Sequence, residues 1–360
     1  MRLVSAPDQA RWGGRAGRPG RRATGVAAAA AGLILVTGCH VPGFSSSNAA
    51  GPTASGTVTV VASPQVADAP LYIGLKDGLF SKAGLTVHVV SASTVPQEVA
   101  ALSNGHADVA FGDYADMFYA QEQKPSPHLL AVADGYDAGP NVMEVLTLPN
   151  SPITTPLKLQ GRTIGTDQSQ GIPTINAKSH KFQPYSMDTV ATASVLGSDN
   201  VEPSKIHWDP MPTSGLIGAL KDRQVSAILA TEPTIYEAES QLGAVPVLDS
   251  CTGATANLPL DGYFTTSSYA TKNAGVVAAF RAALDKAQGQ AGMAAPLQTA
   301  LTHSAGLNAR AAAMVTLGTY PTTLSASNLQ RVVNLMSTFG SLPQSEPLSV
   351  SAMVVKPTGS

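Results

Sequence analysis

The chain has 360 residues, of which 44% are hydrophobic and 13% charged, and its formal net charge at pH 7 is −2. A chain without a basic surplus is not expected to bind nucleic acid. Its two cysteines and seven scattered histidines predict no disulfide framework, metal site or cofactor.

The first 38 residues have the organisation of a secretory signal peptide. Six arginines and one acid, Asp8, lie within residues 1–22, and the uncharged stretch GVAAAAAGLILVTG follows at residues 25–38. This order is typical of export signals, and the apolar run is shorter than the ~20 residues that span a bilayer. A buried core helix is the alternative, but nothing amphipathic follows. We therefore expect export, with Arg21–Arg22 leaving the twin-arginine route as a minor alternative.

Cys39 lies at the end of this apolar run. The sequence VTGC at residues 36–39 resembles the bacterial lipobox. The resemblance implies that Cys39 becomes a mature N-terminus that carries acyl chains such as palmitate and anchors the protein to the outer face of the cell membrane. A plain secretory cleavage site is the alternative. Residues 39–56 are rich in Ser, Gly, Ala and Pro, which predicts a flexible tether.

Strands and helices are predicted to alternate after the tether. The pattern indicates a strand at 56–63, a helix at 70–84 with two glycine stops, a strand at 85–92, a helix at 94–107 and a strand at 107–112. Asp113 is expected to cap a helix at 113–123, and strands follow at 128–136 and 142–149. This alternation is typical of βαβ units with a mostly parallel sheet.

The same alternation restarts in the second half of the chain. Strands are predicted at 159–166, 205–211, 225–231 and 244–250, and helices at 184–200, 214–224 and 232–243. Residues 261–273 predict a strand that leads into a helix. Residues 274–342 are expected to be nearly all helical, with stops at Gly289, Gly306, Pro321 and Gly340. About 300 residues of folded chain are enough for two lobes, and a cleft between lobes is a preferred ligand site.

Five segments resemble, in the same order, the nitrate/taurine/sulfonate-type periplasmic binding proteins, a family that also includes binders of thiamine precursors. They are APLYIGLKDGLFSKAGLTVHVV, VAALSNGHADVAFGDYADM, LQGRTIGT, ATEPTIYEAESQLGAVPV and YFTTSSYATKNAGVVAAFRAALDKA. The resemblance extends from about residue 57 to 342. It implies an α/β, two-lobed periplasmic-binding-protein fold of type II, with mostly parallel sheets and two crossover strands near residues 133–140 and 260–268.

The resemblance also implies a domain organisation and a role. The expected parts are a lipoprotein signal peptide (1–38), a tether (39–56), lobe one (57–138 plus 267–345), lobe two (139–266) and a C-terminal tail (346–360). The expected role is capture of a small solute by hinge closure. A monomer anchored by its lipid would then deliver the solute to the transmembrane subunits of an ABC permease.

The loops that follow the predicted strands supply the candidate site. Ligands of α/β sheets bind beyond the carboxyl ends of strands and near helix N-termini. The candidate ligand-binding residues are Ser63, Gln65, Asp68, Gly112, Asp113, Tyr114, Tyr136, Ser169, Gln170, Gly171, Ile172, Thr174 and Glu232. Purely structural roles remain open as alternatives to ligand binding. The acids can simply cap helices, Gly112 can serve a turn, Gln65 can be a solvated loop residue, and the tyrosines can belong to the core. Cys251 is expected to be a buried or loop thiol.

The candidate loops contain Asp68, Asp113 and Glu232 but no Arg or Lys. This favours a solute with an amine or ring nitrogen, such as a pyrimidine, over a simple anion, although backbone N–H groups alone can hold an anion. The chain has no G-x-S-x-G, H-E-x-x-H or phosphate-loop motif, so we expect no enzyme. Two alternatives on the same fold remain: a lipid-anchored sensor or partner-binding protein, and a thiamine-pyrimidine-synthase-like enzyme, whose cysteine-rich segment this chain lacks.

Overall fold

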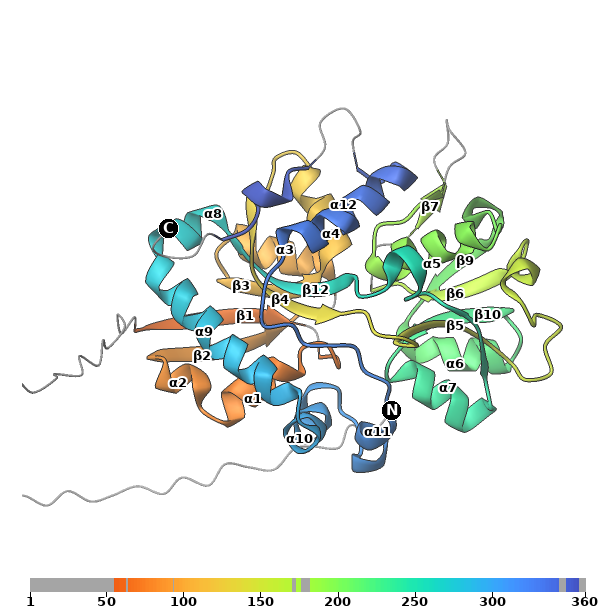
Figure 1. The fold of residues 1–360 in the computed structure, drawn as a ribbon, viewed down its shortest axis with the longest axis horizontal. Helices are drawn as coiled ribbons and strands as arrows, with labels where there is room; N and C mark the ends of the chain where they lie inside the picture. Colours follow the sequence, from red (N-terminus) through yellow and green to blue (C-terminus); the bar gives the residue numbers. More distant parts are fainter. Residues whose placement is uncertain are drawn as a thin grey trace, which may run out of the picture. The chain divides into compact units, whose positions relative to one another are not determined.

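The computed structural model describes residues 55–62, 64–92, 94–169, 173–175, 182–342 and 348–355. These residues belong to one unit that spans Ala50–Ser360, and its strands and helices follow one another as Figure 1 shows. The predicted signal peptide, Cys39 and residues 40–54 of the predicted tether lie outside the described residues.

The first sheet has five strands in the order β2-β1-β3-β12-β4. The strands are β1 (Gly56–Ala62), β2 (Leu85–Ser91), β3 (Val109–Asp113), β4 (Leu129–Asp137) and β12 (Pro259–Thr266). Strand β12 is antiparallel to both of its neighbours, and the other four run in one direction. The alternating, β-branched sequence of β1 therefore forms the strand that its pattern predicts.

The second sheet repeats this arrangement, with the order β11-β5-β10-β6-β9. Its strands are β5 (Met143–Thr147), β6 (Thr163–Asp167), β9 (His207–Met211), β10 (Ala227–Thr231) and β11 (Val245–Asp249). Here β5 is antiparallel to both neighbours and the other four strands agree in direction. A short antiparallel pair, β7 (Thr174–Ile175) and β8 (Phe182–Gln183), stands apart.

The chain passes twice between the two sheets. Strand β4 of the first sheet leads through residues 138–142 into β5 of the second, and β11 returns through residues 250–258 to β12. These two passages explain why β5 and β12 are the reversed strands. The predicted fold class, with mostly parallel sheets and two crossover strands, is confirmed. Strand β12 pairs within the first sheet, up to residue 266, where we expected the second lobe to end.

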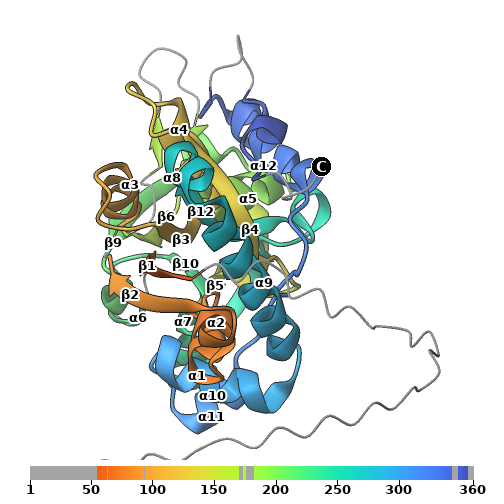
Figure 2. The same cartoon turned by 90° about the vertical axis from the view of Figure 1, so that its left-hand side faces the viewer.

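Helices cover both faces of the first sheet, as Figures 1 and 2 show. On one face α9 packs against α1 and α2, and on the other α3, α4 and α12 contact β3 or β12. These helices are α1 (Ala69–Lys76), α2 (Leu79–Lys82), α3 (Val95–Ser103), α4 (Tyr114–Glu122), α9 (Ala274–Ala291) and α12 (Ala326–Phe339), with α8 (Ser267–Lys272) before α9.

The second sheet is also covered by helices. Helix α6 contacts β6 and β10, α7 contacts β10 and β5, and α5 contacts β11. The bounds are α5 (Met187–Ser198), α6 (Thr213–Lys221) and α7 (Thr234–Leu242). Within the described residues, the short 3₁₀ helices η1 (Pro156–Leu159), η2 (Pro203–Lys205) and η3 (Gly253–Thr255) lie in connections, and η4 (Val350–Ala352) follows α12.

The C-terminal region differs from the predicted run of helices. Helix α9 continues through Gly289, so the predicted stop there is wrong, because packing of α9 against α1 and α2 outweighs the low helix propensity of one glycine. Helices α10 (Ala294–Ser304) and α11 (Ala309–Met314) follow. Residues 315–325 lie outside any helix, and Thr319 forms an isolated bridge with Asp137 instead. The predicted stop at Gly340 is confirmed, with φ at +74°.

None of the described helices is both long enough and apolar enough to cross a bilayer.

Candidate functional site

A cavity of about 370 Å³ opens beyond the carboxyl ends of strands from both sheets. Residues at or just after the ends of β1, β3 and β4 come from the first sheet, and residues at or just after the ends of β6, β9 and β10 come from the second. This is the edge at which open α/β sheets bind ligands. The volume lies at the small end of the range for small-molecule sites.

Five of the residues singled out in the sequence line this cavity. They are Gln65, Asp113, Tyr136, Ser169 and Glu232. Four other described candidates are not among its lining residues: Asp68, Gly112, Tyr114 and Thr174. The remaining candidates, Ser63, Gln170, Gly171 and Ile172, lie outside the described residues.

Asp113 ends β3 and caps α4, as the sequence predicts. Its Oδ1 accepts hydrogen bonds from Ala115 N at 2.7 Å and Asp116 N at 3.1 Å. Its Oδ2 accepts a third from Met187 N, the first residue of α5, at 2.7 Å. One carboxylate therefore joins the end of β3 to the beginning of a helix that packs on the second sheet.

Glu232 makes a corresponding connection from the second sheet. It follows β10, and its Oε2 accepts a hydrogen bond from Tyr236 N in the first turn of α7, at 3.1 Å. Its Oε1 accepts another from Thr316 N at 2.8 Å, in the segment that follows α11. Both oxygens of this carboxylate are therefore engaged by the chain itself.

Tyr136, at the end of β4, also contacts the segment after α11. Its hydroxyl accepts a hydrogen bond from Gly318 N at 2.6 Å, and its ring lies 5.2 Å from that of Tyr320. Burial raises the pKa of Tyr136, so the side chain stays a neutral phenol. The ring is 4% exposed and forms part of the cavity wall.

Tyr114 lies in the core rather than at the cavity. The side chain is fully buried, and its hydroxyl donates a hydrogen bond to Asp134 Oδ1 at 2.9 Å. A Cβ atom at Gly262 would collide with this phenol ring and hydroxyl, so the close approach of β12 requires a glycine there. Tyr114 is therefore a core residue, which is the alternative that the sequence left open for it, and its ring is not exposed to the cavity.

The other three described candidates do not line the cavity, and each has a place in a helix or strand instead. Asp68 is fully buried at the beginning of α1, where its Oδ1 accepts a hydrogen bond from Gln65 N at 3.5 Å. Gly112 lies within β3, where a Cβ would collide with Glu98. Thr174 pairs with Gln183 in the β7–β8 ribbon.

Three acids that the sequence reasoning did not single out also line the cavity: Asp167, Asp188 and Asp261. Asp167 ends β6 and accepts hydrogen bonds from Ser169 N (2.9 Å), Ser169 Oγ (2.8 Å) and Thr213 Oγ1 (2.7 Å). An acid at the end of a predicted strand was a usable signal for Asp167. Asp188 lies in the first turn of α5, and Asp261 lies within β12, where no local pattern marks it.

The cavity is therefore acidic on both sides. Five carboxylates line it, and the described residues of its wall include no Lys, Arg or His. Burial and the Asp261 carboxylate raise the pKa of Asp113 to about 8. Burial, with Asp113 and Asp167 nearby, raises the pKa of Asp188 to about 8. Burial, with Asp188 and Asp134 nearby, raises the pKa of Asp261 to about 7. The side chains of this wall can accept protons and hydrogen bonds, but they offer no positive charge.

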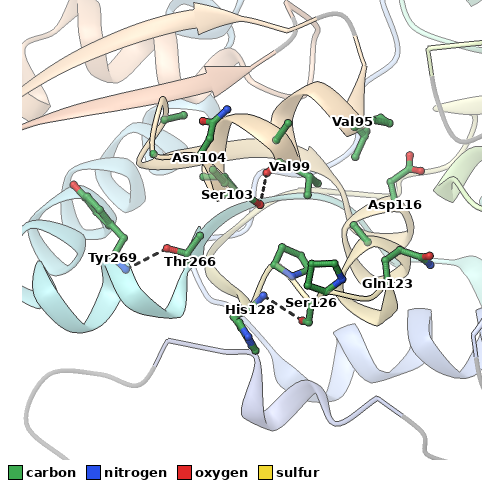
Figure 3. A pocket seen from close by; sticks show the side chains of 18 of the residues that line it. Val95, Val99, Ser103, Asn104, Asp116, Gln123, Ser126, His128, Thr266 and Tyr269 are labelled. Carbon is green, nitrogen blue, oxygen red and sulfur yellow. Dashed lines mark hydrogen bonds between the residues drawn. The ribbon is translucent and has the colours of Figure 1, made fainter.

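A second cavity, of about 1170 Å³, lies against α3, α4 and α8 (Figure 3). Its wall includes Val95 and Val99 of α3, and local hydrogen bonds such as Ser103 Oγ to Val99 O at 2.8 Å occupy several of its polar groups. Ser169 lines both cavities. Since the second cavity gathers fewer acids and lies beside the amino ends of β3 and β4, we take the acidic cavity as the candidate site.

In the described part of the chain, no three His, Cys, Asp or Glu side chains are grouped so that they could hold a metal ion.

Comparisons with known proteins point to one family and one fold. A family model described as "NMT1/THI5 like" matches residues 65–298. The alkanesulfonate-binding protein SsuA from Xanthomonas axonopodis pv. citri, solved with MOPS bound, superposes with a TM-score of 0.63 at 18% identity, over 83% of this chain and 97% of that chain. No curated protein sequence matches at the significance required.

Two further solved structures share the fold. The periplasmic nitrate-binding protein NrtA from Synechocystis PCC 6803 superposes with a TM-score of 0.65 at 14% identity, over 83% of this chain and 86% of that chain. The desulfurization enzyme DSZB superposes with a TM-score of 0.62 at 16% identity, over 82% of this chain and 96% of that chain. Binding proteins and at least one enzyme are therefore built on this fold.

Proposed function

The chain belongs to the NMT1/THI5-like family, and from that premise we propose that it is an extracytoplasmic solute-binding protein of an ABC importer. It would capture a small polar or heterocyclic solute in the acidic cavity and deliver it to the transmembrane subunits of the importer. The observation that supports this most directly is the cavity of about 370 Å³, whose wall comes from strand ends of both sheets. Closure of two such halves around a solute is a known mode of capture.

The residues proposed to contact the solute are the cavity-lining ones. Gln65 and Tyr136 would contribute from the first sheet, and Ser169 from the second. Asp113 and Glu232 would shape the wall while they hold α4, α5 and α7 in place. A contribution from Ser63, Gln170, Gly171 or Ile172 stays a prediction.

The test is a thermal-shift screen of the purified full-length chain. The panel contains sulfonates, nitrate, thiamine precursors, flavins, purines, amines and amino acids. A solute at a hundred times its dissociation constant stabilises the folded state by ~2.7 kcal/mol, which raises the melting temperature by a few degrees. We expect one chemical class to shift the wild type and to lose its effect in Gln65→Ala.

Lys205→Ala serves as the matched control for that screen. Its side chain forms an exposed ion pair with Glu202 and does not line the cavity, so the variant should respond like the wild type. A folded wild type that responds to no compound of the panel would favour the alternative, a sensor or partner-binding protein on the same fold.

The proposal is for a binding protein rather than an enzyme, although DSZB shares the fold. Cys251, the cysteine within the described residues, is 4% exposed, and burial together with the Asp249 carboxylate raises its pKa. A thiol that stays protonated is a poor nucleophile. A synthase-like enzyme remains the second reading, and recovery of the bound solute chemically unchanged after incubation would argue against it.

We also propose that Cys39 anchors the protein to the outer face of the cell membrane, on the strength of the VTGC sequence. Mass spectrometry of the N-terminal peptide should find a diacylglycerol thioether on Cys39. Cys39→Ser should release the protein from the membrane fraction. An unmodified Cys39 in the exported protein would contradict the proposal.

A further inference from the structure

We propose that the solute of the acidic cavity is a small organic cation with N–H groups, an amine or an amidine, held by the carboxylates of Asp188 and Asp261. This inference rests on the proposed function, because it names the class of solute that the same cavity takes. It excludes the sulfonates and nitrate that appear in the names of the structural neighbours.

Three of the five carboxylates that line the cavity already have hydrogen-bond donors from the chain itself. Asp113, Asp167 and Glu232 each accept at least two hydrogen bonds from backbone or hydroxyl groups of the chain. Asp188 and Asp261 line the same cavity, and neither side chain has a hydrogen-bond partner among the residues described. Their oxygens are therefore the acceptors that remain for a solute.

Asp113, Asp188 and Asp261 reach the cavity wall from three different elements of the fold. Asp261 is the direct cross-strand partner of Asp113 in the antiparallel pairing of β12 and β3. Asp188 follows Met187, whose N–H donates to Asp113. Like charges directly opposite each other on antiparallel strands destabilise a sheet. Three acids, on β3, β12 and α5, nevertheless share the wall of this cavity.

The cavity lacks a positive charge of its own in the part of its wall that the structure describes. Buried charges in proteins are normally paired with an opposite charge, yet the described wall of this cavity contains no Lys, Arg or His. Asp68, which follows the lining segment Pro64–Ala67 in the chain, is fully buried, and its Oδ2 has no hydrogen-bond partner in the described structure. Burial, with the Asp261 carboxylate nearby, raises the pKa of Asp68 well above its usual range. The compensating charge is left for the solute to supply.

Protons occupy these carboxylates when no cation is bound, since burial and mutual repulsion raise the pKa of Asp113 and Asp188 to about 8. A bound cation favours the ionised carboxylates and so releases protons. The affinity for a cation should therefore rise with pH, whereas an anion should bind more tightly at low pH. A neutral solute should show little dependence.

The experiment compares three probes of nearly the same shape by isothermal titration calorimetry on the full-length chain. They are benzamidinium (a cation with N–H groups), benzamide (neutral) and benzenesulfonate (an anion), with 1,4-diaminobutane as an aliphatic cation. We expect a cation to bind at least tenfold more tightly than benzamide or benzenesulfonate. Its affinity should increase from pH 6 to pH 9, and its heat at pH 7.5 should differ between phosphate and Tris because protons are released.

Two charge-neutralising variants test the assigned residues. Asp188→Asn and Asp261→Asn should each weaken cation binding about tenfold or more and reduce the number of protons released. Asp209→Asn is the matched control, because Asp209 lies exposed on β9 and does not line the cavity. It should bind the cation like the wild type. Because both cavity substitutions relieve repulsion, the variants should remain folded.

The outcomes separate this inference from the proposed function. Tighter binding of benzamide or benzenesulfonate, an affinity that falls with rising pH, or competition by Ca²⁺ alone would overturn the organic cation while leaving a solute-binding protein. Cation binding that survives both Asp→Asn variants would overturn the assigned residues. If neither these probes nor any solute of the thermal-shift panel binds the folded chain, both proposals fall.

Discussion

Asp113 and Asp261 face each other as a direct pair in the antiparallel register of β3 and β12. The pairing places two acids side by side on the same face of the sheet, at the wall of the cavity. Nothing in the local sequence of either strand compensates for this repulsion.

The unliganded protein should lose stability as the pH rises. In the folded state the pKa is about 8 for Asp113 and Asp188 and about 7 for Asp261, whereas an unfolded Asp titrates near ~3.9. Between these values the folded chain binds more protons than the unfolded chain. The contribution to stability is therefore present below pH ~4 and is lost as the pH rises towards 8, by about 1.4 kcal/mol per pH unit for each extra proton.

Denaturant unfolding at a series of pH values between 5 and 9 measures this effect. The free energy of unfolding should fall across the range, and Asp261→Asn should reduce the slope, whereas Asp209→Asn should not. A free energy that stays constant or rises between pH 5 and 8 would show that these acids do not share protons in the folded state.

Asp261→Asn should also stabilise the empty protein at pH 8. The substitution keeps the shape of the side chain and removes one of two facing charges, and cross-strand pairs of this kind contribute roughly 0.2–1 kcal/mol. The urea midpoint should increase, most at low salt because the repulsion is electrostatic. A lower midpoint than that of the wild type would indicate that Asp261 has a stabilising partner.

Asp113→Ala should destabilise the fold by more than Asp113→Asn. Alanine leaves three N–H groups without an acceptor, those of Ala115, Asp116 and Met187. Loss of a helix cap alone costs ~1 kcal/mol, and each buried group left unsatisfied adds ~1–3 kcal/mol. Asparagine retains one acceptor oxygen for the cap. Equal midpoints for the two variants in guanidinium unfolding would contradict the view that these hydrogen bonds hold the end of β3.

The fold could be predicted from the sequence in more detail than the site. The alternation of β-branched strands and helices, and the cap at Asp113, are local signals that the structure confirms. The predicted helix stop at Gly289 was wrong because packing of α9 on α1 and α2 outweighs the low helix propensity of this glycine. Tyr114 follows a cap, but its burial depends on Asp134 and Gly262, which no local pattern reveals.

The residues of the cavity also divide into those that a local sequence pattern reveals and those that depend on long-range structure. Gln65, Ser169 and Glu232 were found because each follows a predicted strand, and such positions meet at one edge of a sheet. Asp261 lies inside a strand that returns from the second sheet, so its approach to Asp113 depends on long-range register. Asp188 reaches the same place through the entry of α5, which the sequence places only approximately.

Tyr114→Phe should lower stability without changing solute affinity. The substitution removes the fully buried hydroxyl that donates to Asp134 Oδ1 at 2.9 Å and leaves that oxygen with the Gly135 N–H at 3.2 Å as its donor. Loss of one buried hydrogen bond costs about 1 kcal/mol. Tyr114 is not among the residues that line the cavity. Thermal unfolding and calorimetry on the same variant separate the two effects. A loss of affinity at unchanged melting temperature would return Tyr114 to the ligand site.

Glu232→Ala should loosen the segment that follows α11. Thr316 N donates to Glu232 at the end of β10, and Gly318 N donates to Tyr136 at the end of β4, so residues 316–318 contact strand ends of both sheets. Without the carboxylate, the amide of Thr316 has no acceptor and the first turn of α7 loses its contact with Glu232. We expect faster amide hydrogen exchange at Thr316 and Tyr236 in the variant, and weaker solute binding because Glu232 also lines the cavity. Lys205→Ala provides the control with unchanged exchange at both amides. Protection at Thr316 that equals the wild type would mean that other contacts hold this segment, and that its link to β10 does not depend on Glu232.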